Sequence, residues 1–100
     1  MKIVAVTACP TGIAHTYMAA EQLEKTARKL GHEIKVETQG AMGIENELSQ
    51  AEIDAAAGVI LATDIAIEKP ERFDQKRKIE ISVQAALKNP EAIFEKFNAR

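Results

Sequence analysis

Four short segments of the chain have the hydrophobic pattern of β-strands. Residues 2–6 and 59–63 are almost continuously apolar, which is typical of strands covered on both faces of a sheet. Residues 33–38 alternate between polar and apolar side chains, so they predict a half-buried strand. Residues 78–81 alternate between charged and apolar side chains. They predict a fourth strand at an edge, where charges discourage further pairing.

The segments between and after these strands have helical spacing. A first helix is predicted from about residue 15 to residue 30, and Gly31 is placed to end it in the left-handed conformation. Ser49 and Glu52 have the spacing of a capping box, which predicts the start of a short second helix. The tail from about Val83 onward is predicted to be helical.

Strands that alternate with helices through short connections predict right-handed crossovers and a parallel sheet. Residues 39–48 are predicted to be a loop, because Gly40 and Gly43 interrupt any regular pattern. The expected architecture is an α/β, Rossmann-like fold with three layers and an open sheet of four parallel strands. A length of 100 residues predicts one domain, residues 1–100.

Composition excludes several classes of protein. A net charge of −2 argues against nucleic-acid binding, which needs a strong positive field. One cysteine excludes a scaffold of intramolecular disulfides, and two histidines with that cysteine match no zinc pattern, so neither a metal nor another cofactor is expected. The longest nearly apolar run, residues 55–62, is far shorter than the ~20 residues of a membrane span. These features predict a cytoplasmic protein that does not insert into the membrane.

The segment after the first strand carries the candidate chemistry, because ligands of open parallel sheets bind beyond the carboxyl ends of the strands. Gly12 allows successive amides to point inward, the following helix start favours anions, and Thr11 and Thr16 add hydroxyl donors. Such a loop would stabilise the thiolate of Cys9 and hold the oxygens of a phosphoryl group. The alternative is that Cys9 is a small buried hydrophobic residue. His15 has two open interpretations, as a donor to the phosphoryl group or as a cap of the helix.

Three strings of residues resemble one known family, the fructose-type enzyme IIB domains of the bacterial phosphoenolpyruvate-dependent sugar phosphotransferase system. The first string resembles the active-site signature of that family, and it is Cys9-Pro10-Thr11-Gly12-Ile13-Ala14-His15-Thr16. The other two resemble its second and third loops, and they are Glu37-Thr38-Gln39-Gly40 with Gly43 and Asn46, and Ala62-Thr63-Asp64 with Arg72-Phe73.

The resemblance implies a flavodoxin-like sheet and a phosphotransferase that works through a covalent phosphocysteine. Cys9 would be the phosphorylated residue, and the phosphoryl group would be bound by Pro10, Thr11, Gly12, Ile13, Ala14, His15 and Thr16. Gln39 and Asp64 would lie at the rim of the site. The implied donor is a phosphohistidine on a IIA domain, and the implied destination is a fructose-like sugar imported by a membrane IIC permease.

Two other functions remain open at this point. A small cysteine-dependent phosphatase also places a loop of the form Cys, five residues, Arg, then Ser or Thr after its first strand. Here His15 stands where the phosphate-clamping arginine is needed, and Asp64 is the one plausible acid. A regulatory module that uses phosphorylated Cys9 as a signal is the second alternative, because it would need the same loop.

Overall fold

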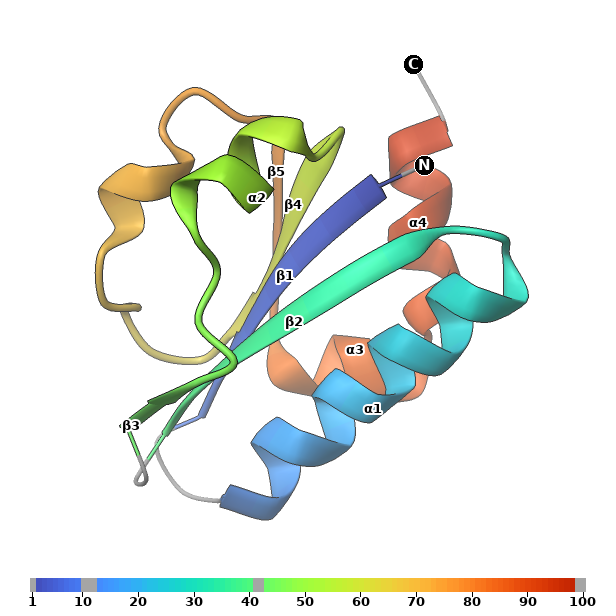
Figure 1. Cartoon of the computed structure of the whole chain (residues 1–100). Coiled ribbons are helices and arrows are strands. Elements are labelled where there is room, and N and C mark those ends of the chain that lie inside the picture. The colour runs from blue at the N-terminus through green and yellow to red at the C-terminus, as the bar shows by residue number, and fades with distance from the viewer. Residues whose placement is uncertain (1, 10–12, 41–42, 99–100) are drawn as a thin grey trace.

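The computed structural model describes residues 2–9, 13–40 and 43–98 of the chain (Figure 1). These residues form five strands, four α-helices and one short 3-10 helix, η1. In order they are β1 (Lys2–Ala8), α1 (Ile13–Lys29), β2 (Glu33–Gly40), β3 (Gly43–Glu45), α2 (Gln50–Ala55), β4 (Gly58–Thr63), η1 (Pro70–Phe73), β5 (Lys78–Ile81), α3 (Val83–Lys88) and α4 (Pro90–Asn98).

The sheet has the strand order β3-β2-β1-β4-β5. β1 pairs in parallel with β2 on one side and β4 on the other, and β5 is the parallel edge strand. The prediction of four strands was wrong, because β3 adds a fifth that pairs antiparallel to β2 within the predicted loop 39–48. Its three residues are too few to show a period of two in the sequence. The four predicted strands and their parallel arrangement are confirmed.

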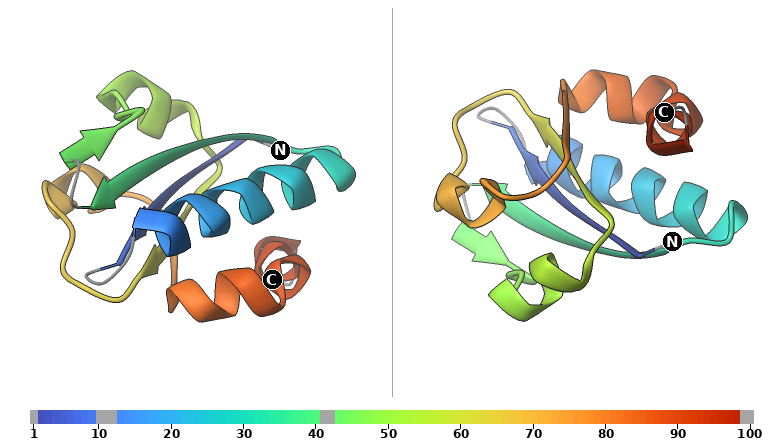
Figure 2. Two further views of the ribbon diagram at one scale, coloured as in Figure 1. Left: turned by 90° about the horizontal axis from the view of Figure 1, so that it is seen from below. Right: turned by 90° about the horizontal axis from the view of Figure 1, so that it is seen from above.

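Helices cover both faces of the sheet, so the three predicted layers are confirmed (Figure 2). Along β1 the side chains alternate between the two faces. Ile3 and Ala5 pack in the cluster that includes residues of α1, α3 and α4, whereas Val4 and Val6 pack in the cluster that includes residues of α2 and η1. None of the described helices is long and apolar enough to cross a membrane.

The ends of the helices follow local signals in the sequence. Gly31 has a φ of 82°, and the amide of His32 donates to the carbonyl of Ala27 at 2.8 Å, so the predicted left-handed stop is confirmed. The capping box of Ser49 and Glu52 is present as predicted. α1 begins at Ile13, about two residues earlier than predicted. Ala14 and His15 in its first turn are exposed, so the apolar period of the helix does not extend to them.

Candidate functional site

Cys9 lies directly after β1, at the carboxyl edge of the sheet and at the point where the strand order reverses. The preceding residue, Ala8, pairs with Gln39 on one side and with Thr63 on the other. The amide of Asp64 donates to the carbonyl of Ala8 at 3.0 Å. The ends of three parallel strands therefore meet around the cysteine, where open α/β sheets bind their ligands.

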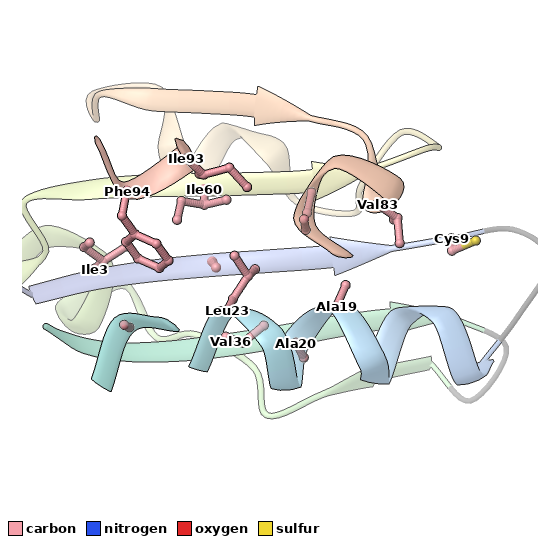
Figure 3. Packing of buried hydrophobic residues seen from close by; sticks show 14 residues of the cluster. Ile3, Cys9, Ala19, Ala20, Leu23, Val36, Ile60, Val83, Ile93 and Phe94 are labelled. Atoms are coloured by element: carbon pink, nitrogen blue, oxygen red, sulfur yellow. The ribbon is translucent and has the colours of Figure 1, made fainter. Parts of the chain in front are cut away.

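The side chain of Cys9 is 6% exposed and lies at the margin of the apolar cluster beneath α1 and α3. Figure 3 shows its sulfur beyond Val83, past the end of the β1 arrow. Cys9 also lines a pocket of about 510 Å³. Burial alone fits a packing role, but the pocket leaves a space beside Cys9 in which a reacting group can be placed.

This pocket, called the Cys9 pocket below, brings together residues from separate parts of the chain. Cys9, His15 and Asp64 line it, and α3 supplies the rest of the wall with Val83, Gln84, Leu87 and Lys88. Two of the candidate residues, His15 and Asp64, thus lie with Cys9. The contribution of α3 was not expected from the sequence, because no motif marks it.

The first turn of α1 faces the same edge of the sheet. The hydroxyl of Thr7 donates to the carbonyl of Thr16 at 3.2 Å, which fixes the start of α1 against the end of β1. Thr16 is 2% exposed, and its own hydroxyl has no hydrogen-bond partner among the described residues. The first four amides of a helix also lack partners within the helix, and α1 has no acidic residue in its first turn. These donors suit a bound anion.

The structure describes only part of the segment between Cys9 and His15. Pro10, Thr11 and Gly12 lie outside the described residues, and so does the side chain of Ile13. Ala14 is exposed in the first turn of α1. The predicted convergence of amides around one point therefore stays a prediction for the first half of the loop.

Asp64 connects the end of β4 to α3. Its Oδ1 accepts a hydrogen bond from the amide of Val83, the first residue of α3, at 3.2 Å. The hydroxyl of Ser82 accepts from the amide of Ala85, so the two side chains together cap this short helix. Asp64 thereby helps to hold α3 as a wall of the Cys9 pocket.

Gln39 is buried and does not line the Cys9 pocket. Its Nε2 donates to Glu37 Oε2 at 2.6 Å and to the carbonyl of Glu68 at 3.3 Å, and its Oε1 accepts from the amide of Glu68 at 2.8 Å. These bonds fasten the segment after β4 to the end of β2. The rim role implied by the resemblance stays a prediction for this residue.

Sequence reasoning missed a buried ion pair between Glu37 and Arg72. Glu37 is completely buried in β2, and its two oxygens accept from Arg72 Nη1 at 2.8 Å and Nη2 at 3.0 Å. Burial opposes ionisation of Glu37, but hydrogen bonds from Arg72, from the amide of Leu48 and from Gln39 outweigh it, and the pKa of Glu37 is lowered. The hydrogen bond to Glu37 likewise raises the pKa of Arg72.

The guanidinium of Arg72 also organises the connection between β4 and β5. It donates to the carbonyls of Leu48, Glu68 and Lys69, and it lies 4.8 Å from the centre of the Phe73 ring. The Glu37–Arg72 pair therefore joins β2, the approach to α2 and η1. The signal available in the sequence was that both residues belong to strings that resemble loops of one family, but nothing in the sequence paired them.

Two carboxylates make the stability of the fold depend on pH. The amide of Ser49, and after it Lys35, lower the pKa of Glu52 from 4.5 to about 2, and the pKa of Glu37 is also lowered. The unfolded chain then takes up protons at a higher pH than the folded chain, so protonation favours unfolding. We expect the free energy of unfolding to fall as the pH drops from about 4.5 to about 2. Urea denaturation at a series of pH values measures it. Glu52→Gln should flatten the slope, and equal slopes in the two proteins would contradict the assignment.

The chain is similar to components of the bacterial phosphotransferase system. The family described as "PTS system, Lactose/Cellobiose specific IIB subunit" matches residues 4–96. The "PTS system fructose-like EIIB component 2" of Escherichia coli is 51% identical over 98 residues, which cover 98% of this chain and 92% of that protein. The "PTS system fructose-specific EIIABC component" of Bacillus subtilis is 50% identical over 95% of this chain, which is 15% of that protein. A solved domain from a fructose-specific IIABC component of Borrelia burgdorferi has a TM-score of 0.91 and 51% identity, and the match covers 96% of this chain and 91% of that one.

Proposed function

This chain belongs to the IIB family of the phosphotransferase system, and from that membership we propose that it is a fructose-type phosphocarrier with Cys9 as the phosphorylated residue. The family description names lactose and cellobiose, whereas the relatives matched over nearly the whole chain are named fructose-like. Near-complete matches at 51% identity are the more specific guide, so we assign the sugar to the fructose-like class.

One observation carries the assignment of Cys9. The single cysteine of the chain directly follows the central strand and lines a pocket at the topological switch point. The hydroxyl of Thr16, which has no hydrogen-bond partner among the described residues, and the first amides of α1 are donors that support binding of a phosphoryl group beside Cys9.

The proposed chemistry has two displacements at phosphorus. In the first, the Cys9 thiolate attacks a phosphohistidine of the IIA partner; the S–P bond forms, the P–N bond breaks, and the histidine nitrogen keeps the electron pair. In the second, a sugar hydroxyl attacks the phosphocysteine; the O–P bond forms, the S–P bond breaks, and the thiolate leaves. The hydroxyl proton passes to a base on the acceptor side. Both steps need mainly positioning and stabilisation of the phosphoryl oxygens.

The proposed partners follow from the organisation of the relatives. One Escherichia coli relative is named an EIIBC component and the Bacillus subtilis relative an EIIABC component, so in both proteins the matched region accompanies other components. We assign a IIA protein as donor and a membrane IIC permease with its sugar as acceptor, which places this chain at the cytoplasmic side. Each contact should be small and transient, because one site must face two partners in turn.

Phosphorylation of the intact chain tests the proposal. We expect incubation with a phosphorylated fructose-type IIA protein to add the mass of one phosphoryl group, and peptide mapping to place it on Cys9. Unphosphorylated IIA protein is the control. A phosphoryl group on His15, or none on the chain, would contradict the assignment.

A further inference from the structure

We propose that Asp64 is an electrostatic positioning residue that raises the free energy of the phosphorylated Cys9 site and so promotes onward transfer. The inference rests on the proposed function and assigns a role to one wall of the Cys9 pocket. Three features of Asp64 support it: its place, its hydrogen bond, and the lack of an ion pair with any described residue.

The place of Asp64 is fixed by the backbone of the central strands. Its amide donates to the carbonyl of Ala8, the residue before Cys9, and Asp64 and Cys9 line the same pocket. The hydrogen bond from the amide of Val83 to Oδ1 holds the carboxylate at this wall. The negative charge is thus held at one wall of the space next to the sulfur.

No residue that the structure describes forms an ion pair with Asp64. This distinguishes it from Glu37, Glu47 and Glu52, whose charges are each matched by a cation. The other charged or titratable side chains that line the Cys9 pocket are Lys88 and His15, on α3 and α1. Since no described cation is in an ion pair with Asp64, its carboxylate contributes a negative charge at its wall of the pocket.

Phosphorylation of Cys9 increases the electrostatic effect of Asp64 on the site. A phosphorylated side chain carries about −1.5 to −2 charges near neutral pH, which is more than either a thiol or a thiolate carries. Repulsion by Asp64 consequently acts more strongly on the phosphorylated form than on the unphosphorylated one. A carrier gains from this difference, because the phosphoryl group is held less firmly and leaves for the next acceptor more readily.

Asp64→Asn separates the charge from the hydrogen bond, since the amide oxygen of Asn can still accept from Val83. We expect the equilibrium between phosphorylated IIA protein and this chain to shift about three- to tenfold toward phosphorylated Cys9, the range for a charge partly screened by water. We expect the return of the phosphoryl group to unphosphorylated IIA protein to slow to a similar degree. The midpoint of urea unfolding should stay unchanged.

Three comparisons make the test specific. Asp54→Asn removes an equal charge from α2. This helix lies near the opposite end of the sheet, since the amide of Ala57 donates to the carbonyl of Lys2. The substitution should leave the equilibrium unchanged, because salt screens charges so far apart. Lys88→Met removes a positive charge lining the pocket and should shift the equilibrium the other way. Added salt should weaken the difference between wild type and Asp64→Asn.

The outcomes separate this inference from the function on which it rests. Absence of phosphoryl transfer to Cys9 in the wild-type chain would overturn the proposed function. Normal transfer in the wild type with an identical equilibrium in Asp64→Asn would overturn the electrostatic role alone. An effect in Asp64→Ala with none in Asp64→Asn would also overturn it, because the residue would then act only by capping α3.

Discussion

Cys9→Ser should lose transfer of the phosphoryl group from a IIA protein by a factor on the order of 10³ or more, the scale seen when an enzyme's nucleophile is removed. A serine hydroxyl is protonated at neutral pH and needs a general base before it can attack, whereas a thiolate is itself the nucleophile. The change is nearly isosteric, so the proposed donors to the phosphoryl group should stay in place. The rate of phosphorylation, followed by rapid quench and mass measurement, checks the prediction.

The fold of this variant should survive, because only one atom changes at the margin of the apolar cluster. Placing a hydroxyl at a site that is 6% exposed should cost about 1–2 kcal/mol of unfolding free energy. Cys9→Ala is the matched variant, since it keeps an apolar side chain there and should lose transfer to the same extent. Transfer to Cys9→Ala at the wild-type rate would show that the cysteine packs rather than reacts.

The sequence predicted the central strands well because their apolar runs are long enough to have a pattern. β1 and β4 are buried on both faces, and hydrophobicity alone marks such strands. β3 could not be found in this way, since three residues that include Gly43 show no alternation. The predicted start of α1 was about two residues late for a related reason, because the exposed Ala14 and His15 do not continue the apolar stripe of the helix.

The residues of the candidate site also differ in whether the sequence reveals them. Cys9, His15 and Thr16 lie in one short stretch of sequence, so a contiguous motif reveals them. The wall formed by α3 depends on how that helix returns to the end of β1, and Leu87 and Lys88 look like ordinary helix residues until the chain is folded. Site residues that are adjacent in the sequence can be recognised as a motif, whereas residues that only packing brings together cannot.

The Glu37–Arg72 pair shows the same limit most clearly, because its members are separated by 35 positions. The alternation in residues 33–38 assigns Glu37 to the polar face of its strand, and that face was expected to be wet. In the folded chain η1 and the residues before α2 cover it, and the carboxylate meets the guanidinium there. Whether a charged side chain is buried depends on tertiary structure, so a local sequence pattern does not reveal it.

Arg72→Met should be among the most destabilising substitutions of a charged residue in this chain. It leaves the fully buried Glu37 carboxylate without its cation, and breaking a buried pair costs about 3–5 kcal/mol. For a domain of this size the melting temperature should fall by roughly 12 °C or more. Thermal and urea unfolding measure the loss. Lys29→Met is the matched control, because its ion pair with Glu91 is exposed and should contribute less than about 1 kcal/mol.

A double substitution tests whether the loss comes from the unpaired charge. In Glu37→Gln with Arg72→Met, position 37 no longer holds a carboxylate, so the double variant should be less destabilised than the sum of the two single variants by about 1–3 kcal/mol. The Arg72→Met variant should also regain stability as the pH is lowered toward the point where Glu37 takes up a proton, the reverse of the trend expected for the wild type. If the losses of unfolding free energy were additive and the pH dependence of stability were unchanged, the two residues would stabilise the fold independently. The ion pair would then not be what joins η1 to β2.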